Sequence, residues 1–229
     1  MIDILYAAIA IIVTIILYLF SKKIQSGRNS PLAQPILIVS AIIILFLLVF
    51  NIPYETYMLG GKWIEFFMGP AVVALAFPLY NHFDMLKKLA VPIIVGTMTG
   101  AVIGVSSGVL IAKWLGFERE LILALAPKSV TTPVALSIVD TLEGPMSLAA
   151  IFVVIAGAGG VLISPVVFKL FHLNTPIGRG IGIGSASHAI GTGSAMGRSD
   201  LEASLSTIAM VLSAIFVSIA APYIVFLLL

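Results

Sequence analysis

The chain is built from long apolar runs separated by short polar segments. Six runs predict membrane-spanning helices, at residues 4–20, 35–50, 63–80, 89–114, 147–171 and 204–229. A helix needs about 20 apolar residues to cross the hydrocarbon core of a bilayer. Of the 229 residues, 60% are hydrophobic and 10% are charged, whereas a soluble domain carries about 25% charged residues. The sequence therefore predicts an all-α polytopic membrane protein.

Two further stretches begin as apolar segments and are then interrupted. In the first, Lys128 stands between Pro127 and Ser129, and Pro133 follows shortly after. A proline removes a backbone donor, and a charge near the bilayer centre costs about 2.5–3.5 kcal/mol, so a stretch that carries both predicts a functional site. The second, residues 176–198, is rich in glycine, which disfavours a plain lipid-facing helix.

The interrupted stretches occupy corresponding positions, because each precedes an acidic residue and a long apolar run. They suggest repeat units at residues 121–171 and 178–229 within a single integral membrane domain of residues 1–229. Paired interruptions are typical of transporters built from inverted repeats. The predicted fold has about six transmembrane helices plus two re-entrant or broken helices from an inverted repeat.

The distribution of Lys and Arg indicates the orientation. Lys22, Lys23 and Arg28 follow the first run, and Lys87 and Lys88 follow the third, which predicts cytoplasmic loops at both places and an N-terminus outside. If both interrupted stretches cross the membrane, the basic residues divide almost evenly between its two sides. If both are hairpins that return to their side of entry, most basic residues fall inside, which the positive-inside rule favours.

Glycine recurs every four residues in the fourth run, at Gly96, Gly100, Gly104 and Gly108. Such a stripe lets another helix approach closely. Tight helix packing and a moving interface are both consistent with it.

Several chemistries are excluded or disfavoured. Without cysteine the chain forms no disulfide and has no thiol catalysis, and His82, His172 and His188 lack helical metal spacing, so neither a metal nor another cofactor is expected. A net charge of +2 gives no reason to expect nucleic acid. His188 has no evident carboxylate to orient it, and the neighbours Lys128 and Ser129 rarely point at one another, so no enzyme is predicted.

Three motifs of the chain are distinctive: residues 126–135 (APKSVTTPVA), residues 187–192 (SHAIGT) and residues 69–80 (GPAVVALAFPLY). Together they resemble the LrgB/CidB family. The resemblance extends over nearly the whole chain, from roughly residue 5 to residue 229, and the Lys-Ser-Val-Thr-Thr-Pro run is its most specific part.

This resemblance implies a multi-pass protein of the bacterial cytoplasmic (inner) membrane and one of two functions. Bacterial members are described as antiholin-like regulators of murein hydrolase export and autolysis, which act with a small holin-like membrane protein of the LrgA/CidA type. A plastidial relative moves glycolate and glycerate, and some bacterial members are linked to pyruvate uptake. The implied substrates of a transporter are therefore small monocarboxylates. The oligomeric state, a homo-oligomer included, is left open.

A carboxylate site follows from the residue types in the two stretches. The ammonium of Lys128 can pair with a carboxylate, hydroxyls can donate to it, and helix N-termini offer free amides and a positive dipole end. The hydroxyls of the first stretch are also expected to cap the half-helix that begins near Pro133. The predicted substrate-binding residues, between the two broken-helix tips, are Lys128, Ser129, Thr131, Thr132, Ser187, His188, Gly191 and Thr192.

Each of these residues also has a simpler interpretation. Lys128 could extend its stem to the membrane interface, the hydroxyls could satisfy helix ends alone, and His188 could be a packed polar residue with one hydrogen bond. Asp140 and Glu143 are candidates for a coupling proton, although they are equally consistent with a position at the membrane surface.

Overall fold

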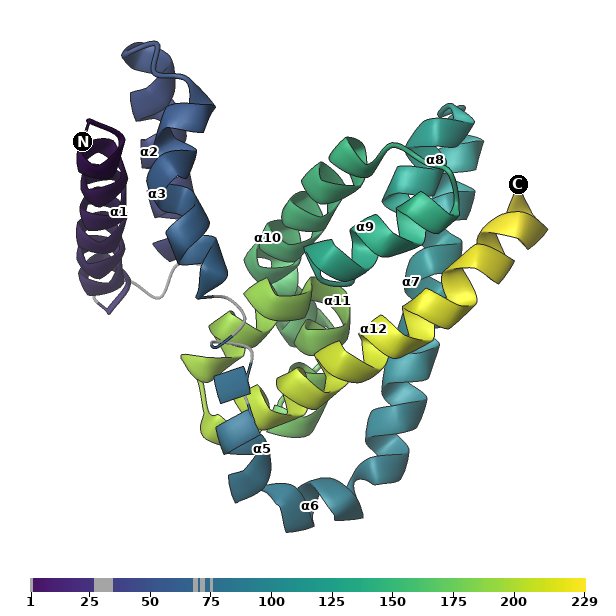
Figure 1. Ribbon diagram of the computed structural model, residues 1–229. Coiled ribbons are helices and arrows are strands. Elements are labelled where there is room, and N and C mark those ends of the chain that lie inside the picture. The colour runs from purple at the N-terminus through teal and green to yellow at the C-terminus, as the bar shows by residue number, and fades with distance from the viewer. Residues whose placement is uncertain (1, 27–34, 68–69, 71–72, 75) are drawn as a thin grey trace. The chain divides into compact units, whose positions relative to one another are not determined.

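The computed structural model describes residues 2–26, 35–67, 70, 73–74 and 76–229, and these residues are helical with no strand among them (Figure 1). Within this described part, four helices are long and apolar enough to cross a membrane. They are α1 (Ile2–Ser26), α7 (Ala90–Trp114), α10 (Met146–Leu170) and α12 (Asp200–Leu228). The prediction of an all-α polytopic membrane protein is confirmed.

The chain divides into two compact units, Met1–Ala76 and Phe77–Leu229. In the first, α1 packs against α2 (Pro35–Val49) and α3 (Tyr54–Phe66). A β-carbon added at Gly60 would lie 2.5 Å from the carbonyl oxygen of Ala7, so the missing side chain lets α3 approach the backbone of α1. That the two units form a single integral membrane domain remains a prediction.

The first unit differs from the expected spans in two ways. Helix α2 has 15 residues, fewer than the roughly 20 that a perpendicular span needs. The expected span at residues 63–80 is not one helix, since α3 ends at Phe66 and the short α5 (Ala76–Asn81) follows. The 69–80 motif and the basic loop that holds Arg28 include positions outside the described residues.

The second unit contains the two interrupted stretches. After α6 (Phe83–Lys88) and α7 come α8 (Arg119–Leu125), α9 (Thr132–Thr141), α10, α11 (Pro176–Met196) and α12. In Figure 1, α10 descends from the loop after α9, whereas α12 rises to the C-terminus. The last helices of the two suggested repeat units therefore run in opposite directions.

The first stretch is broken between α8 and α9. Helix α8 ends at Leu125 and α9 begins at Thr132. Thr131, the residue before α9, has an extended backbone with φ −66° and ψ 150°. Pro133 lacks the N–H that a continuous helix would need at this point. Beyond α9, a β-carbon added at Gly144 would lie 3.0 Å from Cβ of Leu123, so the chain has returned to the side of α8.

The second stretch is a helical hairpin. Its backbone leaves helical geometry at Ser187 (φ −127°, ψ 16°) and His188 (φ 41°, ψ −133°). A β-carbon added at Gly191 would lie 2.5 Å from the carbonyl oxygen of Ile183, so the two halves of α11 pack backbone to backbone. The glycine-rich sequence predicts an interruption, but the break itself lies at two residues that are not glycine. Whether the hairpin re-enters a membrane remains a prediction.

Candidate functional site

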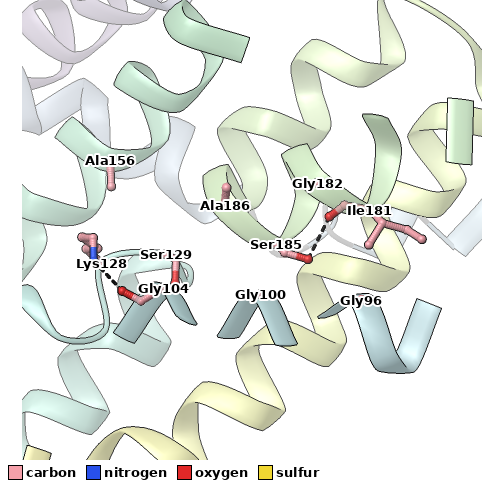
Figure 2. Close-up of a pocket in the computed structure, with 10 residues that line it drawn as sticks. All are labelled: Gly96, Gly100, Gly104, Lys128, Ser129, Ala156, Ile181, Gly182, Ser185 and Ala186. Carbon is pink, nitrogen blue, oxygen red and sulfur yellow. Dashed lines mark hydrogen bonds between the residues drawn. The ribbon is translucent and has the colours of Figure 1, made fainter. Parts of the chain in front are cut away.

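A cavity of about 240 Å³ lies where both interrupted stretches face α7 (Figure 2). The first stretch contributes its turn between α8 and α9, the second contributes the half of α11 that precedes the break, and α10 contributes one residue. The lining residues are Gly96, Gly100, Gly104, Lys128, Ser129, Ala156, Ile181, Gly182, Ser185 and Ala186.

Lys128 provides the positive charge of this cavity. Its Nζ donates a hydrogen bond to the carbonyl oxygen of Gly104 on α7, at 3.0 Å. Among the described residues no carboxylate forms an ion pair with it. An ammonium group has three donors, and the hydrogen bond to Gly104 uses one of them. The arrangement therefore offers a cation and spare donors to a small anion.

The glycine stripe of α7 forms one wall of the cavity. A β-carbon added at Gly96 would lie 3.3 Å from Cγ2 of Ile181, and one at Gly100 would lie 3.7 Å from Cβ of Ser185. A β-carbon at Gly104 would meet nothing within 4 Å. The stripe thus contacts side chains of α11 at Gly96 and Gly100 and has open space at Gly104. The carbonyl oxygen of Gly104 accepts the hydrogen bond from Lys128.

The second stretch reaches the cavity through residues just before its break. Ser185 and Ala186 line the cavity, and Ser187 begins the non-helical backbone. The hydroxyl of Ser185 donates to the carbonyl oxygen of Ile181 at 2.8 Å, as Figure 2 shows. Its oxygen keeps acceptor capacity. Lys128 and Ser185 therefore bring a charged and a hydroxyl group to one cavity from segments that lie far apart in sequence.

The predicted residues of the first stretch divide into two pairs. Lys128 and Ser129 line the cavity, whereas Thr131 and Thr132 are not among its lining residues. Thr131 is the N-cap of α9, but its side chain makes no capping hydrogen bond, so the predicted capping role of this hydroxyl is wrong. The extended backbone of Thr131 already precedes Pro133, whose missing N–H removes one of the donors that a cap would satisfy.

The predicted residues of the second stretch are buried around the break and do not line the cavity. His188 shares a hydrogen bond of 3.0 Å between its Nε2 and the carbonyl oxygen of Val153 on α10. Thr192 donates to the carbonyl oxygen of His188 at 3.0 Å and shares a hydrogen bond of 2.9 Å with the hydroxyl of Ser206. Gly191 packs against the preceding half of α11, as described above, and Ser187 is fully buried. Their assignment as substrate-binding residues remains a prediction.

The coupling candidates lie away from the cavity. Asp140 is exposed near the end of α9, and Glu143 is exposed directly after it, with φ 57°. Neither lines the cavity. A role for either carboxylate in carrying a proton remains a prediction.

Sequence reasoning did not identify a charged cluster around a buried carboxylate, where the two ends of α11 meet the beginning of α12. Glu202, in the first turn of α12, is 1% exposed and contacts two arginines. Nε of Arg198 lies 2.5 Å from one carboxylate oxygen, and Nε of Arg179 lies 3.6 Å from the other. The sequence contains a signal for this cluster, because Arg179, Arg198 and Glu202 flank the glycine-rich stretch. It does not show how deeply each side chain is buried.

Comparison with protein families gives a match over almost the whole chain. The LrgB-like family matches residues 14–227. No solved structure matches the chain.

Similar bacterial proteins extend the comparison. The uncharacterized protein YxaC of Bacillus subtilis (strain 168) is 40% identical over 221 residues, which cover 96% of each chain. The holin-like protein CidB of Staphylococcus epidermidis is 34% identical over 223 residues, 97% of each chain. The holin-like protein CidB of Staphylococcus aureus is 31% identical over 225 residues, 98% of each chain.

Proposed function

The chain belongs to the LrgB-like family, and from that premise we propose that it is a membrane transporter of small organic anions. The observation that carries the proposal is the Lys128 ammonium at the edge of a cavity lined by the two interrupted stretches, α7 and α10. A charge within a bilayer costs about 2.5–3.5 kcal/mol on insertion scales, so such a lysine is a functional-site hypothesis by default.

The size of the cavity supports a small substrate. Pockets for drug-sized ligands hold about 300–1,000 Å³, and this one holds about 240 Å³. One ammonium matches one carboxylate, and the Ser129 hydroxyl adds a neutral donor. The Ser185 hydroxyl already donates to Ile181, so its oxygen is available as an acceptor for a substrate hydroxyl. Pyruvate, glycolate, lactate and glycerate are anions of this kind.

The arrangement of the helices supports alternating access. Two broken segments that meet at one cavity, each followed by a long helix, are the pattern of transporters with inverted repeats. The opposite directions of α10 and α12 are consistent with that pattern. The site would lie near the midplane of a bacterial cytoplasmic membrane, with the N-terminus outside.

The names of the relatives favour a second function over transport. The Staphylococcus proteins bear the name holin-like protein CidB. The corresponding proposal is an antiholin-like regulator of murein hydrolase export that acts with a small LrgA/CidA-type membrane protein. No substrate is needed for that role, so Lys128 would then serve only the packing of the α8–α9 turn against α7.

The two functions are distinguished with purified protein in proteoliposomes and with cells. Uptake of radiolabelled pyruvate, glycolate and lactate is measured for the parent, for Lys128→Met and for Lys169→Met, whose lysine is exposed in the last turn of α10. In parallel, autolysis is followed in cells that express each variant with or without an LrgA/CidA-type protein. If the chain is a transporter, Lys128→Met should weaken uptake roughly ten- to hundredfold, and Lys169→Met should leave uptake unchanged. Autolysis that depends on the chain and its partner, without uptake of any of the three anions, would favour the regulator.

A further inference from the structure

Gly108 lies one helical turn beyond Gly104 on α7, directly beneath the side chain of Lys128. A β-carbon added at residue 108 would overlap Nζ of Lys128 and lie 3.5 Å from its Cε. The same addition at Gly104 meets nothing within 4 Å. Two glycines of one stripe therefore have different surroundings, because a charged group fills the place of a side chain at one of them only.

Helix geometry explains why residue 108 is the one that matters. In an α-helix the N–H of residue 108 bonds to the carbonyl of residue 104, so a side chain at 108 stands beside that carbonyl. This is the carbonyl oxygen that accepts from Lys128. A carbonyl oxygen has two lone pairs, and a residue without a side chain leaves the second one accessible.

Glycine lowers the stability of a helix, so its presence at residue 108 needs an explanation. Glycine is about 1 kcal/mol less favourable than alanine in the interior of a helix. Gly108 is buried within α7, which continues to Trp114, so it is not a glycine that ends the helix. Close packing against another helix is not its explanation, since the atoms that a β-carbon at residue 108 would meet within 4 Å are Nζ and Cε of Lys128.

We infer that Gly108 is a positioning residue for Lys128. Its missing side chain lets the ammonium lie against α7, donate to the Gly104 carbonyl and remain at the edge of the cavity. The contact between Gly108 and Lys128 does not depend on the proposed function, whereas its consequence for anion binding does.

The first test is a double-mutant cycle on thermal stability. Gly108→Ala and Gly104→Ala add the same methyl group to the same helix, and each is made in the parent and in Lys128→Ala. Gly108→Ala should lower the midpoint of thermal unfolding in the parent but not in Lys128→Ala, and Gly104→Ala should lower it in neither. An equal drop from Gly108→Ala in both backgrounds would mean that Gly108 only packs α7, and the inference would be wrong. If Gly108→Ala does not fold alone, folding of the double variant supports the inference and its failure overturns it.

The second test separates positioning from transport. The half-saturation concentration for pyruvate uptake should rise roughly tenfold in Gly108→Ala, the effect of about 1.4 kcal/mol. It should stay unchanged in Gly159→Ala, because a methyl group added there on α10 meets nothing within 4 Å and Gly159 does not line the cavity. If Lys128→Met weakens uptake while Gly108→Ala leaves the half-saturation concentration unchanged, the positioning role is wrong. If the parent takes up no pyruvate but the thermal cycle shows the coupling, the proposed function fails and the positioning role stands.

Discussion

Arg179 and Glu202 hold the beginning of α11 against the beginning of α12, with 3.6 Å between Nε and the carboxylate. Arg198, just beyond the end of α11, contacts the other oxygen of the same carboxylate. A straight helix of 21 residues would separate its ends by about 30 Å. One carboxylate therefore closes the hairpin at its base, and the turn at Ser187 and His188 lies at the opposite end.

Glu202→Gln should destabilise this closure. The substitution keeps the shape of the side chain but leaves two guanidinium groups beside each other without their anion. We expect the free energy of unfolding to fall by about 1.5–3 kcal/mol, the range for hydrogen bonds to charged groups. A larger loss is not expected, because Arg179 and Arg198 keep 33% and 30% of their side-chain surfaces exposed.

Thermal unfolding of the purified protein measures this effect, and Asp200→Asn is its control. Asp200 also lies in the first turn of α12, but it is exposed and belongs to neither ion pair. Both variants lose a favourable interaction with the helix dipole, worth about 0.3–1 kcal/mol. If the two variants lower stability equally, the closure of the hairpin does not depend on Glu202.

The hairpin predicts which loops share a side of the membrane. In the cysteine-free chain, Asn174→Cys lies before α11 and Gly197→Cys lies directly after it. Both positions are exposed, and a β-carbon at residue 197 has only ordinary contacts. An impermeant thiol reagent should label both from the cytoplasmic side.

Leu115→Cys, which follows α7, is the matched control and should be labelled from outside. This set tests the hairpin even if the overall orientation is inverted. Labelling of residues 174 and 197 from opposite sides would mean that α11 crosses the membrane, and the hairpin topology would be excluded.

The sequence was sufficient to predict the class of protein and the positions of both interruptions, because hydropathy and proline act locally. It was also sufficient to place Lys128 at a functional cavity as a hypothesis. It did not predict α3, whose first residues lie between the expected spans at residues 35–50 and 63–80 and instead form a helix that packs against α1. The helical conformation of α3 depends on its packing against α1, which the polarity of the local sequence does not indicate.

The break in α11 shows why the details of the second stretch were beyond the sequence. Glycine permits a break, but Gly180 and Gly184 lie within the helix and let it approach the backbone of α12 near Glu202 and Ser206. The chain turns instead at His188, whose φ of 41° and ψ of −133° are a backbone conformation that residues with a side chain rarely adopt. Its hydrogen bond to Val153, a long-range contact, helps to fix that turn.

His188→Ala should therefore affect stability more than substrate binding. The side chain is 4% exposed, and its ring bonds to the Val153 carbonyl rather than lining the cavity. Removing the ring takes away this hydrogen bond and the packing of the ring against Gly157. The Val153 carbonyl keeps its helical hydrogen bond from residue 157, so we expect the lost hydrogen bond to cost about 0.5–1.5 kcal/mol. We expect a lower midpoint of thermal unfolding and an unchanged half-saturation concentration for pyruvate. A raised half-saturation concentration with unchanged stability would instead support the sequence-based assignment of His188 to the substrate.

Lys128→Met should weaken binding and keep the fold. Methionine keeps an apolar stem of similar length, and losing a charge inside a membrane is itself favourable. The Gly104 carbonyl keeps its helical hydrogen bond from residue 108, so no polar group is left without a partner. Pyruvate binding should weaken by about 1.5–3 kcal/mol, which is roughly ten- to hundredfold.

Two further variants set the scale for Lys128→Met. Lys128→Arg should also impair uptake, because a planar guanidinium is larger than the ammonium, which already lies directly against Gly108. Ser129→Ala should weaken binding less, by about 0.5–1.5 kcal/mol, because it removes a neutral hydroxyl from the cavity wall. Uptake and ligand-dependent thermal shift on monodisperse variants measure all three. A Lys128→Met protein that folds and takes up anions like the parent would mean that the lysine only packs against α7, and the anion site would be wrong.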